Sequence, residues 1–249
     1  MKFWNGNKSP ARQSYELEVL QQVVEATRET HGDASIEEDR TNYPLAEDES
    51  NVFQKGIDLF VTVKGNAKFL DREKIVVDKP IARGLLGKRL MVVREDQLDE
   101  FASIQDEDSL KAKTVGIPET WVDAELFRFN GYQVNEVGSL EDIFQRLANR
   151  EFDYVSWGAI EIEDAFDKLA KPVGGLAIDY HLLVSYPMPL VFYVHPAQEE
   201  LARRISEGIR AISQNGQLDA LFNRHFGKMI EGLHLAPRRT FHLKNPALD

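Results

Sequence analysis

The sequence contains no cysteine among its 249 residues, so it forms no disulfide, no thiolate zinc site and no cysteine nucleophile. No apolar run approaches the roughly 20 residues that a bilayer-spanning helix needs, so no membrane insertion is expected. The start, Met-Lys-Phe-Trp-Asn, lacks the apolar stretch of a signal peptide, which leaves two readings: a cytosolic protein, or a protein whose export signal was removed.

Basic residues are in the minority, with 30 Lys and Arg against 41 Asp and Glu, and the net charge is −11. Because binding to nucleic acid is driven by clustered Lys and Arg, this balance argues against a DNA or RNA partner. Hydrophobic residues at 43% and charged residues at 29% are typical of a globular protein.

Motifs that carry common chemistries are also missing. The chain has no Gly-x-Ser-x-Gly elbow, no P-loop and no Gly-x-Gly-x-x-Gly. The six histidines include no helical i, i+4 pair, so we expect no metal site and no cofactor, and read His195 and His225 as structural. An acidic cluster at Glu161, Glu163, Asp164 and Asp167 is spaced like a helix face, and a solvated face is favoured over paired-carboxylate catalysis.

The elements that are present alternate between helix and strand. In the first third, apolar residues at helical spacing predict a helix over residues 14–30, and β-rich runs predict strands over 57–63 and 89–94. The acidic, weakly periodic stretch 95–110 then suggests a domain boundary. The middle of the chain repeats the same order: strand 114–117, helix 122–130, strand 133–137, helix 140–149 and strand 153–157.

Two of these helix starts show a hydroxyl-to-acid spacing. Thr120 with Asp123, and Ser139 with Asp142, match the capping box that satisfies free amides at the beginning of a helix.

The last third predicts β-rich runs over 176–184 and 190–195, with two prolines between them that interrupt a continuous ladder. A long helix carrying Leu201, Ile205, Ile209 and Ile212 follows, then a shorter one over 217–226. We expect the tail 232–249 to run extended over the surface.

This alternation predicts an α/β protein with two lobes, each a mostly parallel sheet with flanking helices, joined by two crossing strands. We expect residues 1–95 and 187–249 to form lobe 1 and residues 96–186 to form lobe 2. Mostly parallel sheets bind ligands at the carboxyl ends of their strands, so two facing lobes would enclose a cleft.

This order of elements resembles the type 2 periplasmic solute-binding fold, and in particular proteins similar to family 3 of the extracellular solute-binding proteins. The most specific local match is the stretch Asp78–Arg89, and Trp121–Tyr132, Arg150–Val155 and Leu221–His225 follow it in the same order. The resemblance covers nearly the whole chain. It implies a non-enzymatic, monomeric protein of the periplasm, with Met1 standing where a signal peptide was removed.

The sequence departs from the amino-acid-binding members of that family at two points. Those members carry a Thr followed three residues later by an Arg that clamps the α-carboxylate, whereas Thr62 and Arg72 stand ten residues apart. The position aligned with their ammonium-binding Asp is Trp157. The ligand class therefore stays open at this point.

Candidate ligand-binding residues lie near the expected cleft. Thr120 and Trp121 stand at a helix start whose free amides attract anions, and Trp157 offers an aromatic face. Each competes with a plainer reading as a cap, a core residue or a surface charge. The full set of candidates is Trp4, Tyr15, Thr62, Lys64, Arg72, Arg83, Thr120, Trp121, Ser156, Trp157 and Glu161.

The resemblance implies capture of a small polar solute for an ABC-type transporter permease or a sensor kinase. Two alternatives remain: a dehydratase or lyase on the same fold, with Glu161 as its acid, and a ligand-sensing module that docks on a membrane receptor.

Overall fold

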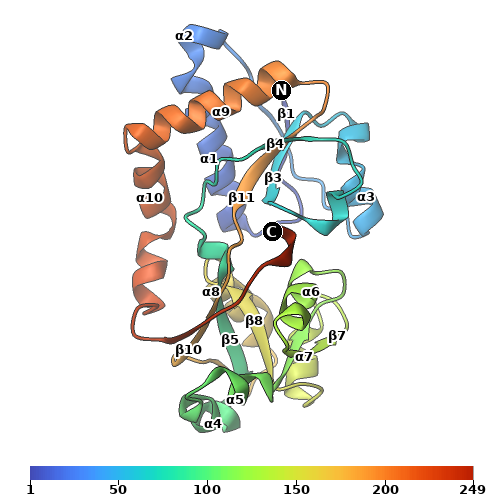
Figure 1. Ribbon diagram of the computed structural model, residues 1–249, viewed down its shortest axis with the longest axis vertical. Helices are drawn as coiled ribbons and strands as arrows, with labels where there is room; N and C mark the ends of the chain where they lie inside the picture. The colour runs from blue at the N-terminus through green and yellow to red at the C-terminus, as the bar shows by residue number, and fades with distance from the viewer. Residues whose placement is uncertain (249) are drawn as a thin grey trace. The chain divides into compact units, whose positions relative to one another are not determined.

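The computed structural model describes residues 1–248, which form two compact α/β units (Figure 1). Unit 1 consists of Met1–Gly84 and Pro189–Lys228, and unit 2 of Leu85–Met188 and the chain from Met229 on. No helix in this described part of the chain is both long and apolar enough to cross a membrane.

The sheet of unit 1 has five strands in the order β2-β1-β3-β11-β4. Strand β1 pairs in parallel with β2 and β3, whereas β11 is antiparallel to both of its neighbours, β3 and β4. Strand β11 is therefore the one reversed strand, and the expectation of a mostly parallel sheet is confirmed. The bounds are β1 Lys2–Trp4, β2 Glu37–Asp39, β3 Leu59–Val63, β4 Ile75–Val77 and β11 Leu190–Val194.

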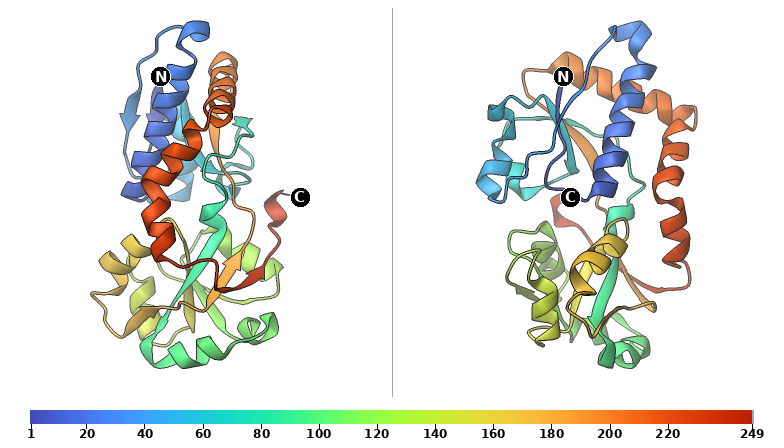
Figure 2. Two further views of the ribbon diagram at one scale, coloured as in Figure 1. Left: turned by 90° about the vertical axis from the view of Figure 1, so that its left-hand side faces the viewer. Right: turned by 180° about the vertical axis from the view of Figure 1, so that it is seen from behind.

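Two long helices, α1 (Pro10–Ala26) and α9 (Glu199–Gln214), pack side by side in unit 1 (Figures 1 and 2). Gly208 of α9 allows this approach, because a Cβ there would come within 2.6 Å of the Val23 side chain. The other helical segments are α2 Arg28–His31, α3 Ala46–Ser50, α10 Gln217–Gly232, which runs past the end of unit 1, and 3₁₀ turns at Val52–Lys55 and Ala67–Phe69.

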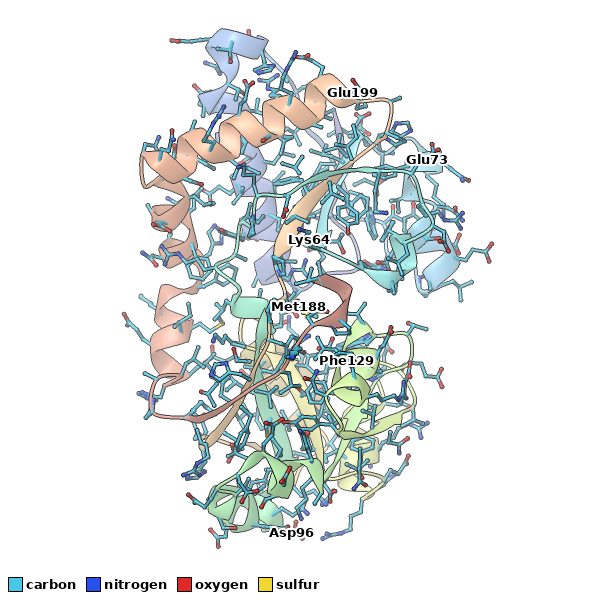
Figure 3. The ribbon with its side chains drawn as sticks, in the orientation of Figure 1. Lys64, Glu73, Asp96, Phe129, Met188 and Glu199 are labelled. Atoms are coloured by element: carbon cyan, nitrogen blue, oxygen red, sulfur yellow. The ribbon has the colours of Figure 1, made fainter. Side chains whose placement is uncertain are left out.

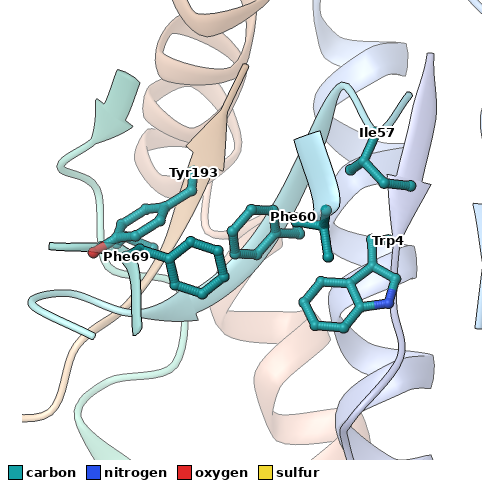
Figure 4. Close-up of a cluster of buried hydrophobic side chains, with 7 residues drawn as sticks. Trp4, Ile57, Phe60, Phe69 and Tyr193 are labelled. Atoms are coloured by element: carbon teal, nitrogen blue, oxygen red, sulfur yellow. The ribbon is translucent and has the colours of Figure 1, made fainter. Parts of the chain in front are cut away.

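An aromatic cluster forms part of the core of unit 1 (Figure 4). The Phe60 ring of β3 lies 5.5 Å from Trp4 and 4.9 Å from Phe69, measured between ring centroids. Phe60 of β3 and Tyr193 of β11, which lie opposite each other in the sheet, thus both belong to this buried cluster.

The sheet of unit 2 follows the order β12-β10-β5-β8-β6-β7, with β9 also paired to β5. Strand β5 is antiparallel to β8, β9 and β10, while the remaining pairings are parallel, so this sheet too has a single reversed strand. The bounds are β5 Lys88–Arg94, β6 Thr114–Ile117, β7 Gln133–Glu136, β8 Tyr154–Gly158, β9 Leu176–Ile178, β10 Leu182–Ser185 and β12 Arg239–His242.

Short helices connect these strands. Gly116 of β6 is required where it stands, because a Cβ would lie 2.2 Å from the Phe152 ring. The helices are α4 Leu98–Ser103, α5 Glu107–Lys111, α6 Val122–Phe129, α7 Ile143–Ala148 and α8 Ile162–Ala165, which continues as a π-helical turn over Phe166–Ala170; 3₁₀ turns lie at Leu85–Gly87, Glu95–Gln97 and Pro246–Leu248.

The structure divides the chain at other points than the sequence suggested. Strand β5 was expected to close lobe 1 at residue 95, but it pairs with β8 along its length and belongs to unit 2. The last helix was predicted over 217–226, but α10 continues to Gly232. The tail 232–249 was expected to run over the surface, but its residues Arg239–His242 form β12, which adds to the sheet of unit 2 in parallel with β10. Backbone pairing between distant segments decides both points.

Candidate functional site

The start of helix α6 lies at the carboxyl end of β6 in unit 2. Trp121 is the N-cap residue, and no side chain caps the first turn. The expected capping box of Thr120 and Asp123 is therefore wrong. Thr120 adopts a positive φ of 69° and donates its backbone N–H to Glu136 at 3.1 Å. Free amides at this helix start are left to water or to a ligand.

Two tryptophans meet beside this helix start. The Trp121 ring lies 5.0 Å from the Trp157 ring, and Trp157 also contacts Phe144 of α7 at 5.4 Å. Trp157 is only 4% exposed, whereas Trp121 is half-buried. Trp121 therefore has more accessible surface than Trp157, and the buried Trp157 ring packs against it.

A buried charged cluster in unit 2 was not expected from the sequence. Arg89 forms an ion pair with Asp123, and both side chains are more than nine-tenths buried. The Arg89 Nε donates to the Tyr186 hydroxyl at 2.6 Å, and that hydroxyl donates to Asp123. Arg89 Nη2 also lies 3.4 Å from the sulfur of Met188.

The electrostatics of this cluster favour its charged form. Burial opposes the charge of Arg89, yet its pKa is raised, because the charge of Asp123, the Tyr186 hydroxyl and the charge of Glu161 outweigh that cost. Burial raises the pKa of Tyr186 well above its ordinary value. The cluster ties the first turn of α6 to the segments at the start of β5 and after β10.

Two further predicted residues lie on or after β8. The Ser156 side chain is 8% exposed, and its hydroxyl has no hydrogen-bond partner within the described residues. Glu161 is half-buried, and its negative charge helps to raise the pKa of Arg89. A buried hydroxyl without a partner is unusual in a native fold, and Ser156 places one in the middle of β8.

In unit 1, Trp4 and Tyr15 are core residues. Trp4 is 2% exposed, packs on Phe60 and donates its indole N–H to the carbonyl of Thr41 at 2.8 Å. Tyr15 is 1% exposed, donates its hydroxyl to the Ile81 carbonyl and packs edge-on against α10. Both polar atoms are already satisfied inside the unit.

The polar candidates after β3 have partners of their own. Thr62 accepts a hydrogen bond from Asn66 at 2.9 Å. Lys64, at the end of β3 (Figure 3), pairs with Asp78 at 2.7 Å with its side chain 37% exposed. The exposed Arg72 makes a long contact of 3.3 Å to the Ser50 hydroxyl, so its guanidinium is the most available cation of this group.

Arg83 contacts helix α10 rather than the polar residues near the end of β3. Its Nε donates to Asp219 at 2.9 Å and its guanidinium lies 4.7 Å from the Phe222 ring, both residues of α10. These contacts indicate that Arg83 fastens helix α10 to the chain beside Gly84.

Unit 1 also contains a buried polar cluster that sequence reasoning missed. At the start of α1, Lys8 and Arg12 both pair with Glu16, whose side chain is fully buried. Burial lowers the pKa of Lys8. The turn Asn-Gly-Asn-Lys-Ser-Pro between β1 and α1, with Ser9 as N-cap, was the available signal for a strand-to-helix site here.

Comparison with known proteins identifies solved structures with a similar fold. No protein-family model and no curated protein matches the sequence. Among solved structures, an ancestral arginine-binding protein bound to arginine is similar at 16% identity, covering 91% of this chain and 98% of that chain with a TM-score of 0.61. A histidine kinase sensor domain with similarity to periplasmic binding proteins matches at 15% identity over 91% and 96%, with a TM-score of 0.61.

The ligand-binding core of GluR0 from Nostoc punctiforme, solved with L-glutamate, matches at 15% identity over 91% of this chain and 99% of that chain, with a TM-score of 0.55. These neighbours are binding proteins and a sensor domain rather than enzymes. The chain has the two-lobed fold of the type 2 periplasmic solute-binding proteins, as its order of elements predicted.

Proposed function

We propose that this protein is a solute-binding protein that captures a small polar molecule. The observation that carries the proposal is the match over 91% of the chain, and over 96–99% of the other chain, to proteins described as arginine-binding, as a sensor domain and as a glutamate-bound core. A fold shared over 91% of this chain with proteins described as binding proteins or a sensor domain favours binding over chemistry.

Features of unit 2 support the same proposal. The first turn of α6 has no side-chain cap, Trp121 presents a half-buried ring beside it, and Ser156 has a hydroxyl without a partner. A helix start of this kind binds an anionic group, and an aromatic ring packs against the apolar or cationic part of a solute. In unit 1 we propose Arg72 and Thr62 as polar contacts to a solute. Lys64 would contact the solute in place of Asp78, its present ion-pair partner.

The direct test is a thermal shift screen against amino acids, organic anions, sugars and organic cations. A solute at 100 times its Kd stabilises the folded state by about 2.7 kcal/mol. For a chain of this size that raises the Tm by about 5–11 °C. If no solute class shifts the Tm, the proposal of capture fails.

A matched pair of variants on one helix tests the site. Trp121→Ala is expected to weaken binding of the solute found in the screen by about tenfold, because an aromatic contact contributes on the order of 1–1.5 kcal/mol. Phe129→Ala removes a ring that is 57% exposed at the other end of α6 (Figure 3) and should leave the Kd unchanged. Equal Kd values for both variants would show that the solute does not bind at the start of α6.

Two roles follow capture: delivery to an ABC-type permease, and signalling to a sensor. The similarity to a histidine kinase sensor domain supports signalling as a candidate role beside delivery. For both roles we propose a periplasmic location and a monomeric state. In a deletion strain, loss of radiolabelled solute uptake supports delivery, whereas intact uptake with loss of a transcriptional response supports signalling.

A further inference from the structure

A groove of about 800 Å³ opens on unit 2, away from the start of α6 and from the residues assigned to solute capture. Its floor is apolar and consists of strand β9 together with side chains of α4 and of the π-helical turn after α8. The apolar and aromatic lining residues are Leu98, Phe166, Leu176, Ala177, Ile178 and Tyr180. The Tyr180 ring is 54% exposed, which is unusual for so large an aromatic side chain.

Carboxylates form the rim of this groove. Glu95 lies in the 3₁₀ turn before α4, Asp99 in the first turn of α4, and Glu163 and Asp167 in α8 and the turn that follows it. Within the described residues, Glu95, Asp99 and Glu163 take part in no ion pair, and Asp167 has a single contact to Lys171 at 3.4 Å between exposed side chains. By contrast Asp164, beside Glu163 in the same helix, pairs with Lys168 at 2.6 Å. Three of the four rim carboxylates therefore carry a negative charge that no ion pair of the described residues compensates.

The local backbone is also unusual. Phe166 and Asp167 enter the groove from a five-residue π-helical turn, Phe166–Ala170. Such turns are rare in proteins and occur frequently at functional sites. The turn brings an aromatic ring and a carboxylate to the same edge of the groove.

The lining identifies the chemistry of an occupant. The described residues contain no group of three or more acidic or histidine side chains that could hold a metal ion, so the rim carboxylates are too dispersed for one compact cation. A molecule with several positive charges separated by apolar stems matches a dispersed acidic rim over an apolar floor. Its ammonium groups would meet Glu95, Asp99 and Glu163 while its methylene groups cover Leu98 and Ile178.

We propose that this groove on unit 2 is a second binding site, and that it takes a linear aliphatic polyamine. The site lies within one unit, so it is independent of the proposed capture of a solute. A polycation bound there would neutralise part of the acidic surface of unit 2.

Isothermal titration of the full-length protein with spermidine, at a fixed ionic strength of about 0.15 M, tests the proposal. At that ionic strength long-range attraction to a protein of net charge −11 is screened beyond about 8 Å, so binding that persists reports a local site. We expect saturable binding at one site with a Kd below about 1 mM, weaker binding of putrescine, and none of 1,4-butanediol, which has the same carbon chain without the charges. Magnesium chloride at the same concentration should not compete.

Two double variants with the same change of charge locate the site. Asp99→Asn with Glu163→Gln removes two rim carboxylates and should weaken spermidine binding by about tenfold. Asp164→Asn with Glu141→Gln removes two carboxylates of unit 2 that do not line the groove and should change the Kd by less than about twofold. Circular dichroism melts of both variants check that each is folded.

Three results would overturn the proposal: no saturable binding of spermidine to the wild type, equal weakening in both double variants, or loss of spermidine binding in Trp121→Ala with no change in the groove variant. The last would place the polyamine at the start of α6. Because spermidine is titrated directly, an absence of spermidine binding would not contradict the proposed capture of a solute. An absence of any solute in the thermal shift screen would likewise not contradict the proposed polyamine site.

Discussion

Removal of the Asp123 carboxylate tests the buried cluster of unit 2 most sharply. In the substitution Asp123→Ala, Arg89 keeps its charge at a site where its side chain is 5% exposed, and it loses the carboxylate with which it forms its buried ion pair. The Tyr186 hydroxyl, the sulfur of Met188 and the charge of Glu161 remain. The guanidinium then lacks its buried counter-ion, and half-buried Glu161 is the acidic group left to offset its charge.

The structure sets the expected magnitude. Breaking a buried ion pair by removing one partner costs about 3–5 kcal/mol. For a chain of this length that lowers the Tm by roughly 6–20 °C. The milder substitution Tyr186→Phe removes two hydrogen bonds that involve charged groups and should cost about 1.5–3 kcal/mol. The triple substitution Arg89→Met, Asp123→Leu and Tyr186→Phe removes every polar group of the cluster and should recover most of the loss, because apolar replacements of a buried pair are often neutral.

Urea unfolding followed by tryptophan fluorescence measures these differences. In a Trp4→Phe background the remaining tryptophans, Trp121 and Trp157, both lie in unit 2, so the signal reports that unit. A loss below about 1 kcal/mol in Asp123→Ala, or a triple variant as unstable as the single one, would refute the account of Asp123 as the counter-charge that makes burial of Arg89 tolerable.

Three further outcomes are expected. Trp157→Ala should lower the free energy of unfolding by about 3–5 kcal/mol, since the ring is packed on Phe144; a change under 1 kcal/mol in urea melts would show that the site tolerates the cavity. Gly116→Ala should destabilise unit 2 by about 1–3 kcal/mol because the methyl group meets the Phe152 ring, and an unchanged Tm would contradict that clash. The pKa of Asp39 is lowered by hydrogen bonds from Thr41 and by Lys2, so its contribution to stability is present above its unfolded value near 3.8 and is lost as the pH falls below it; Asp39→Asn should flatten the stability profile between about pH 4 and 2, and an identical profile for the variant would rule this out.

Local spacing was enough to predict much of the fold. The strands β6, β7 and β8 and the helices α6, α7 and α9 lie within a few residues of where periodicity placed them, since a helix or strand needs only neighbours along the chain to show its apolar face. The two-lobed architecture followed from their alternation.

The candidate site was predicted less completely. The sequence pointed to the start of α6 and to both Trp121 and Trp157, but it expected Thr120 to cap the helix, and it left out Arg89. An arginine at the start of a strand has no local signature of burial, because its partners are determined by tertiary packing.

What the sequence by itself determined is therefore the order of the main helices and strands and the class of fold, because these depend on residues two to four positions apart. Only the tertiary structure decided that Arg89 meets Asp123, 34 residues away, and that Tyr186 reaches Asp123 from 63 residues away. It also decided that β12 joins β10 and that Glu95 and Glu163 share one groove. Such contacts depend on how distant segments pack, and no spacing within a single element specifies them.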